Sequence, residues 1–189
     1  LTGLVIGIST VVSLVSITES MTSDIEVKLN RFGANIVMVP KTDTLSLSYG
    51  GIDVSGVNYE LRELEEAKIT EINKIKDSKN ISIIAPKALG SVSLQDKAVL
   101  LMGVVFKEEL ALKTWWHVRE GAFPEKWDEL LLGAGIAEHL GIIAKDTIDL
   151  SGKVFKVAGV LNPTGTSEDD AVIMELSAAQ QILKKEGKV

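Results

Sequence analysis

The chain has 189 residues, with 20 Lys and Arg against 26 Asp and Glu, which gives a formal charge of −6. A general nucleic-acid-binding domain carries a basic excess, so this balance excludes that class. The apolar share of 46% and the charged share of 24% are typical of a folded domain. The absence of Cys excludes disulfides, thiolate metal sites and cysteine nucleophiles. The length predicts one domain, with room for two lobes.

Residues 1–17 carry no charged side chain. As a helix they span roughly 25 Å, against a hydrocarbon core of about 30 Å, so we interpret them as the C-terminal part of a transmembrane helix that begins upstream. Gly3 and Gly7 are spaced for close helix packing in lipid. The alternatives are a buried core helix and the apolar part of a signal peptide.

An apolar stripe continues beyond this segment at steps of three or four residues, which predicts one unbroken helix with a stalk at residues 18–32. Its members are Leu14, Ile17, Met21, Ile25, Leu29 and Phe32. We expect this stripe to couple the membrane helix to the folded part. The first charges after the apolar segment are Glu19, Asp24 and Glu26, without the basic cluster that marks a cytoplasmic flank, which favours an extracytoplasmic exit.

The remaining pattern predicts an α+β fold, in which a mixed βαβ-type lobe and a β-rich lobe follow the membrane and stalk helix. The first half is expected to hold a buried strand at 35–39, a loop at 41–58, one amphipathic helix or two short ones within 59–79 with a break near Ile69 and Thr70, and strands at 81–85, 89–94 and 99–105. The second half is expected to hold a strand at 129–132, a helix at 133–140, a hairpin of 147–150 with 154–160, a strand at 171–174 and a helix capped by Ser177 that runs to residue 184.

The expected extracytoplasmic domain covers residues 33–189. Its α/β lobe covers about 33–88 and 161–189, and its β-rich lobe about 89–160. Trp115, Trp116 and Trp127 lie on the connection between strands of the β-rich segment. We expect these indoles to seal the junction between the lobes, with contact to a partner as the alternative.

Candidate chemical groups are few, and the sequence predicts no catalytic, cofactor-binding or metal-binding residue. His117 and His139 have no second His or Cys at ligand spacing. Glu168, Asp169 and Asp170 lack the spacing of a calcium loop, and we interpret them as a solvated acidic turn that fixes the approach to the last strand. No nucleophile elbow and no phosphate-binding glycine loop occurs.

Several of these motifs occur in a familiar order. An apolar helix leads into FGANIVMV, and NISIIAP follows; the C-terminal half then reads LLLG, a short helix ending at Leu140 and Gly141, DTI, FKVAGVL, a Thr and Gly turn, an acidic pair and an Ala-Gln-Gln helix. Over nearly its whole length the sequence resembles the extracytoplasmic domain of MacB/FtsX-like ABC transporter permeases. One departure is that Ala144 and Lys145 precede Asp146 where the family commonly has a Gly.

The resemblance implies a noncatalytic domain that couples cytoplasmic ATP hydrolysis to export, extraction or signalling outside the cytoplasmic membrane. It implies an ABC ATPase partner that holds ATP and Mg, a second identical or related permease, contact with membrane lipid, and an envelope adaptor or exported substrate. It also implies a second stalk and three further membrane helices, so the sequence is expected to be one piece of a longer permease. The alternative is a membrane-tethered extracellular domain that binds a ligand or protein without an ATPase.

Overall fold

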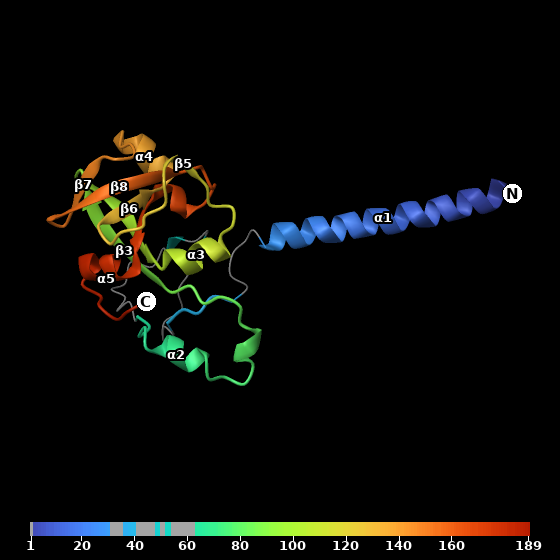
Figure 1. Ribbon diagram of the computed structural model, residues 1–189, viewed down its shortest axis with the longest axis horizontal. Coiled ribbons are helices and arrows are strands. Elements are labelled where there is room, and N and C mark those ends of the chain that lie inside the picture. Colours follow the sequence, from blue (N-terminus) through green and yellow to red (C-terminus); the bar gives the residue numbers. More distant parts are fainter. Residues whose placement is uncertain (1, 31–35, 41–47, 50–51, 54–62) are drawn as a thin grey trace.

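The computed structural model describes residues 2–30, 36–40, 48–49, 52–53 and 63–189 (Figure 1). For Leu4, residues 23–30 and the two short strands at 48–49 and 52–53 it describes the backbone only. The helices are α1 (Thr2–Asn30), α2 (Lys68–Ile72), α3 (Phe106–Leu112), α4 (Ala134–Leu140) and α5 (Leu176–Leu183), with short 3-10 helices η1 (Ser78–Asn80) and η2 (Ser167–Asp170). The strands are β1 (Ser48–Tyr49), β2 (Ile52–Asp53), β3 (Lys87–Leu94), β4 (Lys97–Val104), β5 (Val118–Gly121), β6 (Glu129–Leu132), β7 (Thr147–Leu150), β8 (Lys153–Leu161) and β9 (Ala171–Glu175).

Helix α1 is continuous across the expected membrane boundary at residue 17 and through the expected stalk to Asn30. Its segment Val5–Thr22 is long and apolar enough to cross a membrane, and none of that segment is buried against the rest of the chain. Among the described side chains of α1, the hydroxyls of Thr10, Thr18 and Thr22 each donate to the carbonyl oxygen four residues earlier, at 2.8–2.9 Å. Such bonds satisfy hydroxyl groups where water is absent.

A seven-stranded mixed sheet organises residues 87–175. Its strand order is β3-β4-β9-β6-β8-β5, and β7 pairs with β8 beside this path. The pairs β4–β9 and β6–β8 are parallel, and the other pairs are antiparallel. The sheet curls, so that β3 and β7 approach one another. β1 and β2 form a separate antiparallel pair.

The two central strands β6 and β9 are buried on both faces, which explains their continuous apolar sequences. Alternate side chains enter opposite cores, as Leu130 and Leu131 do. The first core lies with α4 and α5 and includes Leu101, Leu130, Leu132, Phe155, Val157, Val172, Met174 and Ala178. The second core includes Met102, Val104, Phe106, Trp116, Leu131, Leu161, Ala171 and Ile173.

Helix α5 packs on β3 and β4 because two strand residues there are glycines. A Cβ on Gly90 would overlap the Leu183 side chain, and a Cβ on Gly103 would overlap Cβ of Ala179. The missing side chains therefore set the distance between helix and sheet. The first core depends on this close approach, since Ala178, Ala179 and Ile182 of α5 belong to it.

The structure confirms the α+β class with its N-terminal apolar helix. It also confirms the strands expected at 89–94, 99–105, 129–132 and 171–174, the helix at 133–140 and the hairpin of β7 and β8 across Ser151 and Gly152. The lobe boundaries near residues 88 and 160 stay a prediction. β9, from the segment assigned to one lobe, pairs with β4 and β6 from the segment assigned to the other.

The expectation of a buried strand at 35–39 was wrong for its described part, since residues 36–39 form no strand and their side chains are 57–82% exposed. The strand expected at 81–85 was also wrong. These apolar runs have the composition of strands, but a strand also requires a neighbour that bonds its backbone. Most of the expected loop at 41–58 lies outside the described residues, and β1 and β2 lie within it.

Three further details differ from expectation. Within 63–79, only the short helix α2 is α-helical, and Ile69 and Thr70, where a break was expected, lie inside it. None of the residues of α2 is buried, so no packing stabilises a helix of greater length here. Helix α5 has its N-cap at Glu175 instead of Ser177. Helix α3 and strand β5 were not expected from the sequence.

Candidate coupling helix and buried charge cluster

The described side chains of the coupling stripe are free of contact with the folded domain. Leu14, Ile17 and Met21 are 58–66% exposed on α1. Ile25 and Leu29 lie in α1, but their side chains are not described, and Phe32 lies outside the described residues. The coupling role of the stripe stays a prediction. An exposed apolar surface of this length requires lipid or another apolar helix to cover it.

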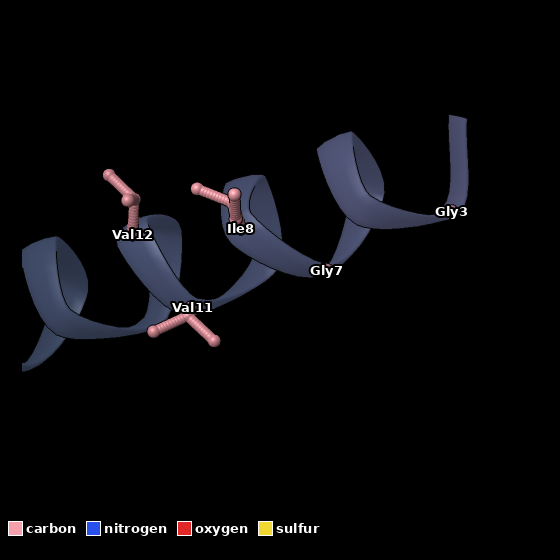
Figure 2. Close-up of a pocket in the computed structure, with 5 residues that line it drawn as sticks. All are labelled: Gly3, Gly7, Ile8, Val11 and Val12. Carbon is pink, nitrogen blue, oxygen red and sulfur yellow. The ribbon is translucent and has the colours of Figure 1, made fainter. Parts of the chain in front are cut away.

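The two glycines of α1 make a shallow apolar groove near its N-terminal end (Figure 2). The groove is lined by Gly3, Gly7, Ile8, Val11 and Val12. Apart from the adjacent backbone of α1 itself, no described heavy atom lies within 4 Å of the position a Cβ would take at either glycine. The backbone is therefore open to close approach by another helix, as the small-residue spacing indicates.

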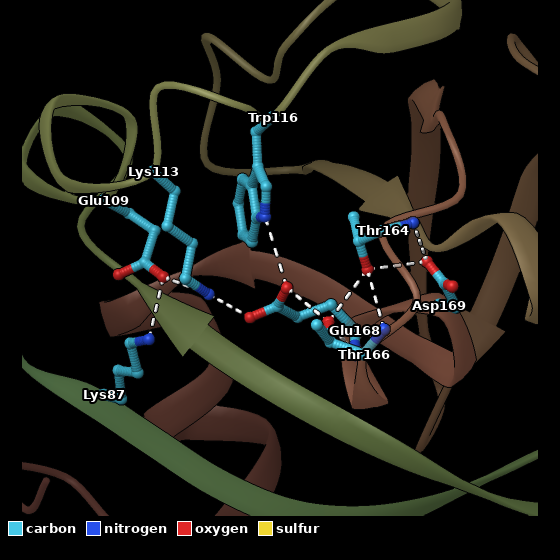
Figure 3. Close-up of polar contacts among 8 residues, drawn as sticks. All are labelled: Lys87, Glu109, Lys113, Trp116, Thr164, Thr166, Glu168 and Asp169. Carbon is cyan, nitrogen blue, oxygen red and sulfur yellow. Dashed lines mark hydrogen bonds and ion pairs between the residues drawn. The ribbon is translucent and has the colours of Figure 1, made fainter. Parts of the chain in front are cut away.

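Four charged side chains form a cluster on the second-core side of the sheet (Figure 3). We call Lys87, Glu109, Lys113 and Glu168 the charge cluster. Lys87 begins β3, Glu109 lies in α3, Lys113 is the C-cap residue that follows α3, and Glu168 lies in η2. Glu109 is 0%, Lys113 6% and Glu168 9% exposed. The cluster therefore joins three elements that are separate in sequence.

The contacts within the charge cluster are short. Nζ of Lys87 and Nζ of Lys113 each lie 2.8 Å from Oε1 of Glu109, and Lys113 also pairs with Oε1 of Glu168. The contacts to Glu109 are ion pairs without hydrogen-bond angles, and its Oε2 has no partner among the described residues. Two ammonium groups face two carboxylates, so the buried charges compensate one another.

Oε2 of Glu168 accepts hydrogen bonds from two neutral donors. Nε1 of Trp116 donates to it at 3.3 Å and Oγ1 of Thr166 at 2.7 Å. Burial by itself raises the pKa of Glu168, but Lys113 and these donors outweigh burial and hold the pKa below its ordinary value. Burial by itself lowers the pKa of Lys113. The contacts with Glu109 and Glu168 raise it by more, so the pKa of Lys113 lies above its ordinary value.

These shifts predict that the charge cluster stabilises the fold between acidic and strongly basic pH. Because the pKa of Glu168 is lower in the folded chain, its contribution is present above about pH 4.5, its ordinary value, and is lost as pH falls through the folded pKa. Lys113, with a raised pKa, contributes below about pH 10.5, its ordinary value, and loses this contribution as pH rises through its folded pKa.

We expect Glu168→Gln to flatten the fall in stability between about pH 5 and pH 2, because the substituted side chain no longer takes up a proton on unfolding. The measurement is the urea midpoint of the whole chain in detergent at each pH, with the parent chain beside it. An acid slope equal to that of the parent would contradict the assignment. Part of the slope is expected to remain, since the pKa of Asp169 is also lowered.

The acidic turn is held by its own carboxylate. Oδ1 of Asp169 accepts from N and Oγ1 of Thr164, each at 2.8 Å, and Oδ2 accepts from N of Gly165 at 2.9 Å. Burial raises the pKa of Asp169, and these donors lower it further than burial raises it. The expected solvated turn is wrong for Glu168, which is buried against Lys113 because the neighbouring α3 supplies a cation. Among the described residues no three side chains of metal-ligating type converge.

The three tryptophans lie in different surroundings. Trp116 is 4% exposed in the second core, and Trp115 packs against that core. Trp127 is 43% exposed; its ring lies 5.8 Å from that of Phe155, and Nζ of Lys153 lies 5.4 Å from it. The structure thus brings Trp115 and Trp116 to one core and Trp127 to the other side of the sheet, beside Phe155 of the first core. Their role at a lobe junction or partner contact stays a prediction.

The two histidines are not brought together. Nδ1 of His117 lies 2.8 Å from the carbonyl oxygen of Trp115, and Nδ1 of His139 lies 3.9 Å from Asp170. The sequence patterns did not predict the roles of Glu109 and Lys113 in the charge cluster. The spacing of Glu109 and Lys113, four residues apart, is a helical ion-pair signal that an expectation of α3 would have revealed.

The described structure is thus an α+β domain with a curled mixed sheet, preceded by a long apolar helix. The model of the MacB-like periplasmic core domain matches residues 1–188, and the chain belongs to this family. A comparison with curated proteins finds no match.

Two solved structures have a similar fold. The extracellular domain of the noncanonic ABC-type transporter YknZ from Gram-positive bacteria is 14% identical, with a TM-score of 0.54 over 67% of this chain and 69% of that one. The periplasmic region of MacB from Actinobacillus actinomycetemcomitans is 11% identical, with a TM-score of 0.51 over 69% of this chain and 63% of that one. At these identities the likeness concerns the fold, and the chain spans less than two thirds of the MacB region.

Proposed function

We propose that this chain is the extracytoplasmic part of an ABC transporter permease, anchored in the cytoplasmic membrane by α1, and that it passes motion produced by cytoplasmic ATP hydrolysis to the outside. Membership of the MacB-like family and the solved domains of two ABC-type transporters support the class. The process that this motion drives outside the membrane is export, extraction or signalling.

The observation that carries the coupling role is the continuity of α1. One helix contains the candidate membrane span Val5–Thr22 and continues to Asn30. A helix is stiff along its axis because each turn is bonded to the next, so displacement at its membrane end reaches its outer end. Its described apolar side chains are exposed, so this surface is available for contact with lipid and with neighbouring membrane helices.

In this proposal the domain is noncatalytic and holds no cofactor. ATP and Mg belong to an ABC ATPase subunit on the cytoplasmic side. A second identical or related permease completes the assembly, and an envelope adaptor or exported substrate contacts the domain outside. The charge cluster serves the stability of the domain, because each of its buried charges has a compensating partner at short distance.

The test is purification of the full-length gene product from its own membranes in gentle detergent, followed by identification of its partners and measurement of ATP hydrolysis. We expect an ABC ATPase in near-equal amount. If no ATPase is recovered and none is fused to the gene product, the proposal is overturned, and a membrane-tethered binding domain becomes the better function.

A substitution in the coupling stripe tests the role of α1 in the assembled protein. Ile25→Asp places an unpaired charge in an apolar seam, which costs several kcal/mol if the seam is packed, so we expect loss of coupling between ATP hydrolysis and the outer domain. The matched control is Ser23→Asp, which adds the same charge two residues away, on the other side of the helix. Equal coupling in the two variants would exclude this stripe.

A further inference from the structure

Two short segments, residues 63–66 before the sheet and residues 185–189 after it, pair with each other through backbone hydrogen bonds. Leu64 and Val189 exchange both backbone hydrogen bonds, at 3.0 and 2.8 Å, and N of Glu66 donates to O of Gly187 at 2.9 Å. Glu65 and Lys188 form an antiparallel bridge between them. In Figure 1 the C-terminus lies beside the start of the segment that leads to α2. We call residues 63–66 with residues 185–189 the clasp.

Two ion pairs cross the clasp in its observed register. Nζ of Lys185 lies 2.6 Å from Oε1 of Glu63, and Nζ of Lys188 lies 3.4 Å from Oε1 of Glu65. The Lys185 and Glu63 side chains are only 25% and 26% exposed. Partly exposed ion pairs contribute little individually, but a shift of one residue would lose both.

One buried amide ties the clasp to the rest of the domain. Gln180 of α5 is 6% exposed, and its Nε2 donates to Oε2 of Glu66 at 3.0 Å and to O of Lys188 at 2.9 Å. Its side chain thus bonds both segments of the clasp. Lys185 adds a bond from Nζ to O of Leu89 in β3 at 3.3 Å. Since α5 packs on β3, β4 and β9, the clasp is anchored on the sheet.

We propose that the clasp is a rigid joint through which movement of the chain that follows α1 reaches the sheet, with Gln180 as its positioning residue. Among the described residues, Leu64 and Glu66 are the first after α1 that hydrogen-bond to the body of the domain. In this proposal, displacement of the preceding chain acts on the bonds between Leu64 and Val189. If the hydrogen bonds of the clasp were broken, residues 63–66 would move by themselves and the displacement would not reach the sheet. The role in coupling rests on the proposed function; the rigidity of the joint does not.

Formation of the clasp is tested by hydrogen exchange in the full-length protein. Gln180→Ala removes both bonds of the amide, and we expect the Leu64, Glu66 and Val189 amides to exchange about tenfold faster. The matched control is Gln181→Ala, the next residue of α5, which is exposed and accepts a bond from Lys153 outside the clasp. Unchanged protection in Gln180→Ala, or an equal loss in Gln181→Ala, would overturn the assignment of Gln180.

An engineered disulfide across the clasp distinguishes opening of the clasp from a general effect of Gln180→Ala on α5. Glu65 and Lys188 face each other across the bridge as the pair that does not exchange backbone bonds, so their Cα atoms lie at about 4.5 Å, within disulfide range. Residues 1–189 contain no Cys, so Glu65→Cys with Lys188→Cys supplies the only disulfide that can form within this part of the protein. Added to Gln180→Ala, this pair is expected to restore slow exchange under oxidising conditions and not after reduction. Each single Cys variant is the control.

The same variants are then compared for coupling of ATP hydrolysis in the assembled protein. We expect Gln180→Ala to lower coupling at least threefold and the oxidised cysteine pair to restore it. Restored protection without restored coupling, or loss of coupling on oxidation of the otherwise unchanged chain, would show that the clasp is no rigid joint for transmission. If the parent protein has no associated ATPase activity, the proposed function fails, while exchange and disulfide rescue still decide whether the clasp is a rigid joint.

Discussion

Lys113→Ala is expected to lower the free energy of unfolding by about 3–5 kcal/mol, because it leaves two buried carboxylates without their shared cation. Glu109 is fully buried and Glu168 nearly so. Lys87 would remain beside Glu109, but Glu168 would keep only its neutral donors Trp116 and Thr166. The measurement is urea unfolding of the whole chain in detergent, followed by tryptophan fluorescence.

The matched control for this prediction is Lys107→Ala, which removes the same side chain from an exposed position of α3. Surface substitutions of this kind change stability by about 0.5 kcal/mol or less. Similar losses in the two variants would mean that the charge cluster is not a net source of stability. The environment of Trp116 supplies a second readout, since its Nε1 bonds to Glu168 and its ring lies 4.5 Å from Nζ of Lys113.

Gly133→Ala is expected to cost about 3 kcal/mol, although alanine adopts the backbone conformation of Gly133 readily. Its φ of −66° and ψ of 156° are ordinary extended values. The constraint is space, because an added Cβ would overlap the carbonyl oxygen of Glu168 and lie 2.5 Å from that of Asp169. Both atoms are backbone, so η2 as a whole must move, and overpacking of this kind is destabilising. Urea unfolding of the whole chain measures the loss.

Displacement of η2 also predicts a local signature, since η2 presents Glu168 to Lys113. Gly133→Ala should therefore change the fluorescence of Trp116 in the folded chain. The control is Gly152→Asn at the turn of the β7–β8 hairpin, where φ is +83° and no atom lies within 4 Å of an added Cβ. Asparagine tolerates that conformation, so a loss of about 1 kcal/mol or less is expected. Equal losses at the two positions would contradict the role of space at Gly133.

Most of the sheet could be predicted because its signals are local. The hairpin of β7 and β8 follows from alternating side chains on both sides of Ser151 and Gly152, and β6 and β9 follow from short apolar runs. Helix α3 was missed because its apolar residues follow β4 without a turn signal between them. The run at 36–39 shows the opposite error, since its strand-forming side chains stay exposed and its backbone pairs with no strand in the described part of the chain.

The sequence by itself determined α1, the class of the fold and the likeness to the MacB family, because periodicity, apolar length and the order of motifs are properties of neighbouring residues. The tertiary structure decided the charge cluster and the clasp. Lys113 and Glu168 are 55 residues apart, and Glu65 and Lys188 are 123 apart. No local pattern specifies such pairs, because their partners are chosen by how the sheet and α5 pack. For the same reason the closeness of Gly133 to η2 is visible only in the folded chain.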